Sequence, residues 1–240
     1  MKIVTEHDYI GQSNDHPWQS KFVVLQYEQG GYSFFPHAMY RNWFDDEVDT
    51  GQLFIGRCSG LGVGTVVNCD TEHQCLRIGR FVSGGQRLRF LLNGQHHTQT
   101  ISTAMLGIHG MGLQHPYPPQ YADSVIKNDV WLGDEVMMLG GGVVENGCII
   151  GARSLLPPNF KSEPYGIYAG SPAKLIRFRF SEKIRECLLQ LAWWDMPLSW
   201  IQTHNAFFLQ DLGTDEGKSL EMLMELMQLK TQAEAVQLEE

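Results

Sequence analysis

The sequence predicts an all-β solenoid of triangular cross-section, interrupted by one long loop and followed by a helical tail. Residues 126–155 read as five ungapped six-residue units. Residues 98–124 break this period and are rich in Gly and Pro, the residues that mark turns and loops. Beyond residue 178 the apolar side chains recur at helical spacing. These three observations give the expected order of the elements.

The six-residue units predict the solenoid because neither common secondary structure repeats with that period. The units are IKNDVW, LGDEVM, MLGGGV, VENGCI and IGARSL, and the same frame starts earlier, at Ile55 and at Ile78. An α-helix repeats about every 3.6 residues and a strand every two. A unit that forms one short strand and one prism corner fits the pattern, with its first side chain in the core and a compact fifth residue. The first-place residues are Ile126, Leu132, Met138, Val144 and Ile150.

The chain divides into three parts. Residues 1–50 are rich in aromatic side chains, and they either cap the open end of the solenoid or line a pocket. Residues 51–178 form the solenoid. We expect its loop, residues 98–124, to be one wall of an active site, because long irregular loops in compact domains are usually functional or disordered. Residues 179–240 form the helical tail, with Ser181 as its first N-cap.

Composition excludes several classes of protein. The net charge of −9 over 240 residues argues against a nucleic acid or an anionic membrane surface as the main partner. No apolar run approaches the ~20 residues of a membrane span, and the start, MKIVTEHDYIGQ, is not a signal peptide, so we expect a cytoplasmic protein. The five cysteines include no Cys-x-x-Cys pair, so we expect neither a disulfide framework nor a metal site.

Four stretches resemble a known family: IGRFVSGGQRLRFLLNGQHH, SVIKNDVWLGDEV, YGIYAGSPAKLIRFRF and LAWWDMP. They are similar to motifs of the hexapeptide-repeat acyltransferases, in the xenobiotic acetyltransferase branch, and the resemblance covers about residues 51–210. It implies a left-handed parallel β-helix of hexapeptide repeats. It also implies a homotrimer that binds acetyl-CoA in the groove between two solenoids, without a metal.

The stretch LLNGQHHTQT carries the candidate base. In the family the catalytic histidine follows the Asn of an Asn-Gly turn by four residues, so the resemblance implies His97, counted from Asn93. A largely neutral imidazole at pH 7 can take the proton of an acceptor hydroxyl. His96 stands where relatives carry Asn, and it either fills that residue's hydrogen-bonding role or touches the acceptor. Tyr32 and Phe34 join Asn93 and His96 on the expected acceptor side.

The resemblance also implies the remaining site residues. Trp131 either donates its indole N–H to the developing oxyanion or only lines the groove. Asp134 and Ala152 are expected along the acetyl-CoA groove. Lys174 and Arg177 are expected near the nucleotide phosphates, because a cation suits a phosphate.

The expected reaction is acetyl-CoA-dependent O-acetyl transfer to a saccharide hydroxyl of the capsule or lipopolysaccharide type. An antibiotic hydroxyl is the alternative, because the resemblance is weakest at the acceptor wall. A zinc-dependent hydratase uses the same solenoid but needs His-x₄-His, whereas His109 and His115 read His-x₅-His. A non-catalytic scaffold is the third class, and release of thiol from acetyl-CoA would distinguish it from an enzyme.

Overall fold

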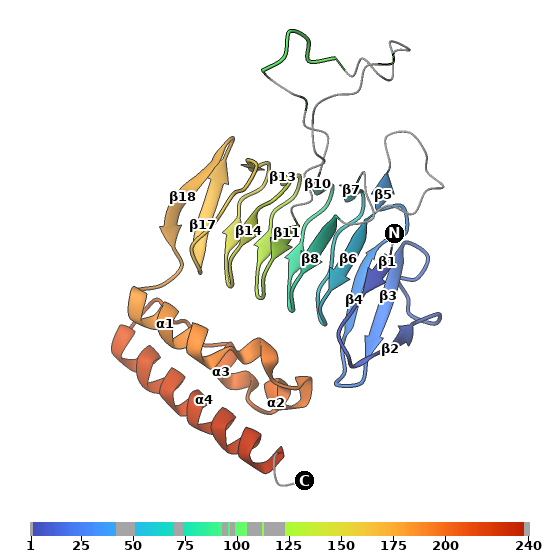
Figure 1. Cartoon of the computed structure of the whole chain (residues 1–240). Coiled ribbons are helices and arrows are strands. Elements are labelled where there is room, and N and C mark those ends of the chain that lie inside the picture. Colours follow the sequence, from blue (N-terminus) through green and yellow to red (C-terminus); the bar gives the residue numbers. More distant parts are fainter. Residues whose placement is uncertain are drawn as a thin grey trace.

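Three β-sheets form the body of the molecule, and their strands are parallel except for the last strand of one sheet (Figure 1). The computed structural model describes residues 2–41, 51–69, 74–92, 96, 99–104, 112 and 123–237. Sheet 1 holds β1 (Lys2–Val4), β6 (Gln52–Ile55), β8 (Cys75–Ile78), β11 (Ser124–Ile126) and β14 (Val143–Val144). Sheet 2 holds β9 (Ser83–Gly84), β12 (Trp131–Leu132), β15 (Ile149–Ile150), β17 (Gly166–Gly170) and β18 (Ala173–Phe178). Sheet 3 holds β5 (Tyr40–Arg41), β7 (Val66–Asn68), β10 (Arg89–Leu91), β13 (Met137–Leu139) and β16 (Leu155–Leu156).

The chain visits the three sheets in rotation. β11, β12 and β13 lie in sheets 1, 2 and 3, and β14 returns to sheet 1. Trp131 pairs with Ile149, and Met137 pairs with Leu155, so residues 18 positions apart lie side by side. One turn of the coil therefore uses three six-residue units. The left-handed winding stays a prediction.

The predicted inward direction of the first place in each unit is confirmed. All of these side chains are 0–1% exposed: Ile126, Leu132, Met138, Val144, Ile150 and Leu156. Fully burying one such side chain contributes about 1.5–3 kcal/mol, so this column is a main source of the coil's stability. The fifth places at Val130, Val136, Cys148 and Ser154 are buried as well.

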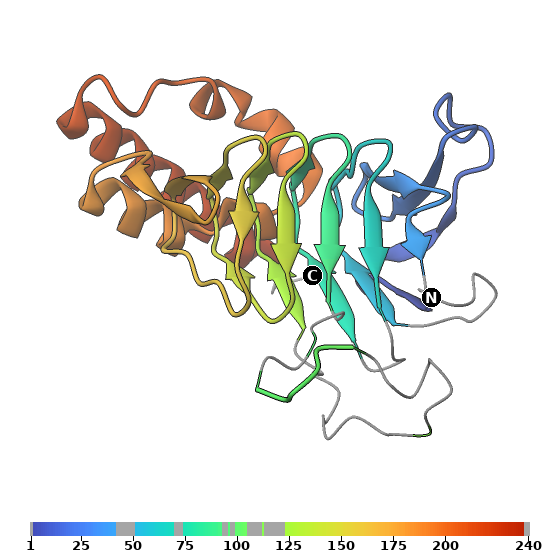
Figure 2. The ribbon, with the colours of Figure 1, turned by 90° about the horizontal axis from the view of Figure 1, so that it is seen from above.

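The N-terminal segment lies against the first coil (Figure 2). β1 pairs with β6, and β5 pairs with β7, so both extend the coil's own sheets. A separate antiparallel sheet consists of β2 (Tyr9–Gln12), β3 (Phe22–Tyr27) and β4 (Tyr32–Pro36). Phe34 of β4 bridges Gly60 of the coil. A Cβ at Gly60 would lie 2.2 Å from the Phe34 ring, so only glycine permits this close approach.

The tail runs back along one side of the coil (Figure 1). It consists of α1 (Glu182–Leu191), the 3₁₀ helix η2 (Trp193–Asp195), α2 (Leu198–Thr203), α3 (Asn205–Phe208) and α4 (Glu216–Gln237). Its apolar side chains form a second core with Tyr165 of the coil, apart from the core inside the coil. No helix in the described ranges combines the length and apolarity that crossing a membrane requires.

A buried arginine joins the coil to the tail. Arg57 is 1% exposed, and its Nη2 donates to the carbonyl oxygens of Trp194, at 3.0 Å, and Met196. Its Nη1 donates to the Gln29 side chain of the N-terminal segment. Burial lowers the pKa of Arg57, but an arginine keeps its charge. Three parts of the chain therefore meet at one guanidinium.

A second arginine repeats this connection nearer the surface. Arg80 pairs with Glu6 of the N-terminal segment, and its Nη1 lies 2.7 Å from Asp195 of the tail. The ring of Phe81 packs on Trp193 with 4.6 Å between the ring centres. The Trp-Trp-Asp-Met-Pro stretch is thus held against the coil through its carbonyls, its carboxylate and its indole.

Candidate active site

The outer face of sheet 2 carries two of the predicted site residues in one line. Trp131 pairs with Ile149, Ile149 with Ile167, and Ile167 with Arg177 of β18. Directly paired residues place their side chains on the same face of a sheet. That face is the outer one, because Trp131 is 56% exposed while its neighbour Leu132 is fully buried.

The same line continues toward the N-terminal segment. Trp131 also pairs with Ser83, Ser83 bridges Gly60, and Gly60 bridges Phe34. Three steps between neighbouring strands, each about 4.8 Å, place Phe34 roughly 14 Å from Trp131. The two residues between them, Gly60 and Ser83, have small side chains or none, so the surface is recessed between the two aromatic rings. We call this line the sheet 2 row: Phe34, Gly60, Ser83, Trp131, Ile149, Ile167 and Arg177.

The predicted acceptor residues Tyr32 and Phe34 belong to an aromatic cluster at one end of this row. Tyr32 is 45% exposed, and its ring centre lies 4.8 Å from that of His16. The Phe34 ring packs edge-on against Trp18, at 5.1 Å, and Phe22, at 5.3 Å. The structure therefore brings both residues together on the N-terminal hairpin.

Asp134 and Ala152 lie on the edge where the chain passes from sheet 2 to sheet 3. A Cβ at Gly133 would lie 2.5 Å from the Ala152 nitrogen, so glycine lets the two successive coils approach here. Both predicted side chains are exposed. The Asp134 Oδ1 accepts a hydrogen bond from the backbone N–H of Gln86 at 2.8 Å. Asp134 thus has a structural partner within the chain.

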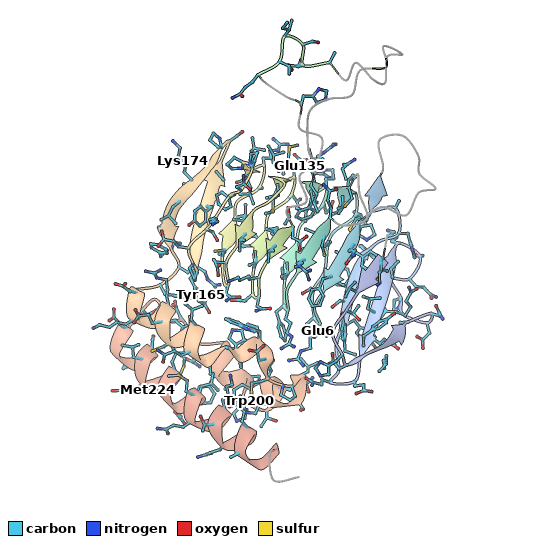
Figure 3. All side chains as sticks on the ribbon, in the orientation of Figure 1. Glu6, Glu135, Tyr165, Lys174, Trp200 and Met224 are labelled. Atoms are coloured by element: carbon cyan, nitrogen blue, oxygen red, sulfur yellow. The ribbon has the colours of Figure 1, made fainter. Side chains whose placement is uncertain are left out.

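Lys174 and Arg177 lie on β18, which closes sheet 2 as an antiparallel edge strand. Both side chains are exposed. The Arg177 Nη1 donates to the Phe178 carbonyl at 3.0 Å. Figure 3 places Lys174 and Glu135 on the side of the coil away from the tail. Lys174 is therefore on the open side of the molecule, and Arg177 ends the sheet 2 row through its pairing with Ile167.

The histidine pair is only partly described. His97 and Asn93 lie outside the described residues, as do His109 and His115. The Nδ1 of His96 lies 2.6 Å from the Thr103 carbonyl oxygen. A carbonyl can only accept, so Nδ1 carries the proton and donates it. Within the described ranges, no cluster of His, Cys, Asp and Glu side chains could hold a metal ion.

Sequence reasoning missed a line of charges on the same edge as Asp134. Glu135 lies 2.7 Å from the Arg87 Nη2 and 2.8 Å from the Arg153 Nε. Hydrogen bonds from Arg87 and then Arg153 lower the pKa of the Glu135 carboxyl. The sequence contains a signal for the Glu135–Arg153 pair. The two residues have opposite charges and lie one coil apart in the sequence, so they are expected to be neighbours on the same edge.

Comparison with known proteins identifies the family. No protein-family model matches the chain. A probable macrolide acetyltransferase of Lysinibacillus sphaericus is 39% identical over 126 residues, which cover 50% of this chain and 69% of that protein. The chain belongs to the xenobiotic acetyltransferase branch of the hexapeptide-repeat acyltransferases.

Another member of this branch matches a shorter stretch at higher identity. A chloramphenicol acetyltransferase of Escherichia coli is 48% identical over 80 residues, so the chain spans 37% of that protein's length and the match covers 33% of the chain. A solved structure of a mutant N-acyltransferase from Bacillus cereus aligns with 78% of this chain and 98% of that chain at 16% identity. Its TM-score is 0.42, a similarity too weak to carry information about this chain.

Proposed function

We propose that the chain transfers an acetyl group from acetyl-CoA to a hydroxyl of an antibiotic, with His97 as general base. Family membership sets the class of reaction. The structural observation that carries the proposal is the sheet 2 row, which joins the aromatic cluster at Phe34 to the cation at Arg177 through Trp131. One end suits an apolar acceptor, and the other suits a phosphate-bearing donor.

The acceptor is the finer part of this proposal. The two named relatives act on antibiotics by their names, which favours an antibiotic over the saccharide predicted from the sequence. A saccharide hydroxyl stays the second candidate, because the exposed rings of Trp18 and Tyr32 offer apolar area to either kind of molecule.

The donor end of the row fits acetyl-CoA, which supplies the acetyl group as a thioester. Among the described residues, the Lys174 ammonium has no hydrogen-bond or ion-pair partner, so it is available to a phosphate. The Asp134 carboxylate is engaged by Gln86, so we assign Asp134 to the shape of the edge. Ala152, exposed beside Gly133, keeps that edge low.

The reacting end of the site uses the loop after β10. His97 takes the proton of the acceptor hydroxyl as the new C–O bond forms. His96 donates through Nδ1 to the Thr103 carbonyl, which leaves its Nε2 able to accept a hydrogen bond from the acceptor. Trp131 turns its indole to the outer face of sheet 2, where its N–H can donate to the acyl oxygen.

We also propose that three copies of a left-handed coil assemble. Trp131, Leu175 and Ile176 are exposed at 56%, 39% and 63%, and a neighbouring copy would cover them and complete the donor groove. No disulfide joins any of the five cysteines, which supports a location in the reducing cytoplasm. Sedimentation at micromolar concentration should give a trimer, and an active monomer would contradict this part.

A pair of substitutions at the two ends of the row tests the proposed function. Purified protein is supplied with acetyl-CoA and, separately, with a macrolide, chloramphenicol and a panel of sugars, and thiol release is followed. Tyr32→Ala should raise the KM for the accepted hydroxyl compound and leave the KM for acetyl-CoA unchanged, and Arg177→Ala should do the reverse. Absence of acceptor-dependent thiol release across the panel, or the same KM pattern in both variants, would overturn the proposal.

A further inference from the structure

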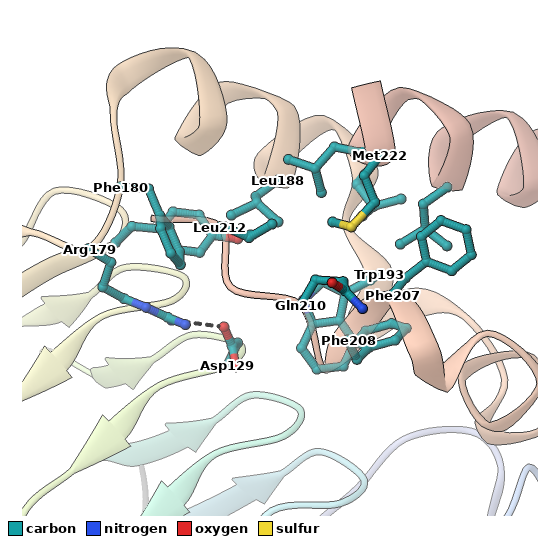
Figure 4. Close-up of a pocket in the computed structure, with 14 residues that line it drawn as sticks. Asp129, Arg179, Phe180, Leu188, Trp193, Phe207, Phe208, Gln210, Leu212 and Met222 are labelled. Atoms are coloured by element: carbon teal, nitrogen blue, oxygen red, sulfur yellow. Dashed lines mark hydrogen bonds and ion pairs between the residues drawn. The ribbon is translucent and has the colours of Figure 1, made fainter. Parts of the chain in front are cut away.

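A cavity lies between the coil and the tail, and its lining residues Asp129 and Arg179 are each two positions from a member of the sheet 2 row (Figure 4). It has a volume of about 170 Å³. Residues of the coil corner near Asp129 form one wall, and α1, α4 and the segment around Gln210 form the others. We call it the tail cavity. No part of the proposed transfer reaction uses it.

The coil side of the tail cavity is polar. The Arg179 Nη1 donates to the Asp129 Oδ2 at 3.1 Å and to the Gly147 carbonyl at 2.8 Å. Within the described part of the chain, the other guanidinium N–H groups and the Asp129 Oδ1 have no hydrogen-bond partner. The pair is 26% and 28% exposed, so a donor and an acceptor stand side by side at the cavity wall.

A buried phenol belongs to the same wall. Tyr165 lines the cavity and is 1% exposed, and its hydroxyl oxygen has no hydrogen-bond partner among the described residues. The Arg179 guanidinium lies 5.5 Å from the centre of its ring. The Tyr165 ring therefore lies beside the Asp129–Arg179 pair on the coil side of the cavity.

The tail side is apolar and aromatic. Leu188, Trp193, Phe208 and Met222 line it (Figure 4). An engineered cavity of about 150 Å³ in another protein holds one benzene molecule, so the tail cavity has room for one substituted ring. Its aromatic walls favour a ring, because aromatic pairs attract one another beyond the effect of the area they bury.

We propose that the tail cavity binds a small neutral molecule with one ring and one hydroxyl group, which is the chemistry of a phenol. The ring lies among Leu188, Trp193 and Phe208. The hydroxyl donates to the Asp129 carboxylate and accepts from the Arg179 guanidinium. A charged ligand is disfavoured, because Asp129 and Arg179 already balance each other and an extra charge would lose its hydration without a counterion.

The test uses two fluorinated probes of almost the same shape, 4-fluorophenol and fluorobenzene, and the full chain. Binding is measured by ¹⁹F line broadening as the protein is titrated. The phenol should bind at least about tenfold more tightly, because a hydrogen bond to a charged group is worth about 1.5–3 kcal/mol and 1.4 kcal/mol is tenfold. Equal affinities for the two probes would overturn the proposal.

Two substitutions place the binding in the tail cavity. Met222→Trp fills it from α4, and Leu212→Trp fills it from the segment before α4. Met224→Trp is the matched control, because Met224 lies on the same helix and is 49% exposed. Melting temperatures check that each variant folds. The fillers should reduce 4-fluorophenol binding at least tenfold, and Met224→Trp should leave it unchanged.

A further titration separates the tail cavity from the active site. Saturating coenzyme A and acceptor should not displace 4-fluorophenol from the wild-type protein. Displacement by either of them, or full binding in both folded filler variants, would place the phenol elsewhere and overturn the proposal. Neither result depends on whether the protein transfers acetyl groups.

Discussion

Two edges of the same coil share a backbone turn and differ in what covers them. On the edge between sheets 1 and 2, Asp129, Gly147 and Tyr165 follow one another at intervals of one coil, with φ of 55°, 69° and 59°. On the edge between sheets 2 and 3, Glu135 and Arg153 both have φ of 61°. The tail covers the first edge, and the second is open (Figure 3). The same backbone turn therefore accommodates different residue types, and the residue at each position suits what surrounds that edge.

The pKa values of the two paired carboxyl groups, one on each edge, are shifted in opposite directions. Burial raises the pKa of the Asp129 carboxyl above its ordinary value of 3.8, although Arg179 acts to lower it. On the open edge, hydrogen bonds from Arg87 and Arg153 lower the pKa of the Glu135 carboxyl. The two carboxyl groups therefore differ in the direction of their pKa shifts, which is upward on the covered edge and downward on the open edge.

The largest effect we predict is on turnover. His97→Ala should lower kcat by ~10²–10⁴ and leave acetyl-CoA binding almost intact, because a positioned base acts in the transition state. His96→Asn should be mild, since an amide can still donate and accept. If instead His96→Asn abolishes turnover and His97→Ala does not, the histidine register is wrong by one residue. Steady-state kinetics of both variants decide it.

The next effect is on stability, at the covered side. Arg57→Met should lower the free energy of unfolding by about 1–3 kcal/mol, because the Met196 carbonyl loses this donor and the Trp194 carbonyl keeps only the longer hydrogen bond from Arg80 Nη1, at 3.4 Å. Arg153→Met is the matched control on the open edge. Arg153 is 81% exposed there, so the change should stay within about 0.5 kcal/mol. If urea unfolding shows the same loss of unfolding free energy in both variants, the contrast between the covered and open edges is wrong.

A smaller effect concerns donor binding. Lys174→Ala should raise the KM for acetyl-CoA about threefold to tenfold with little change in kcat, because the ammonium binds a remote phosphate equally in the ground and transition states. The increase should shrink with a donor that lacks the 3′-phosphate. The same increase with both donors would mean that Lys174 does not contact that phosphate.

The smallest effect is the pH dependence of stability, and its sign differs between the edges. The folded chain holds the Asp129 proton to higher pH than the unfolded chain, so this group makes stability fall as pH rises above 3.8. Glu135 adds stability above its ordinary pKa of 4.5, and that stability is lost as pH falls through the lowered value. Urea unfolding across pH 3–6 should therefore show a steeper rise with pH for Asp129→Asn and a flatter one for Glu135→Gln.

The coil was predictable because its information is local and repeated. The first place of each unit, from Ile126 to Leu156, must be apolar wherever the coil turns, and every one of these side chains is buried. The placement of Asp134 and Ala152 on one edge follows from the same period. Trp131 faces outward for the same reason, since it precedes a buried first-place residue.

The contacts between distant segments were not predictable in this way. Arg57 joins Gln29 to Trp194 and Met196, and no period relates these positions. The pairing of Asp129 with Arg179 depends on where the tail turns back, which the tail's own sequence does not specify. The sheet 2 row as far as Phe34 also required the structure, because it depends on how the N-terminal hairpin docks on Gly60.

The reversal of β18 has a consequence for growth of the sheet. Every other partner in sheet 2 is parallel, and a coil that ended on a parallel strand would present an edge able to continue onto another coil. β18 instead runs antiparallel to β17, and the side chains of its residues Lys174 and Arg177 are exposed. Charged edge strands resist pairing with further chains. The last strand therefore protects the molecule from end-to-end polymerisation into fibres.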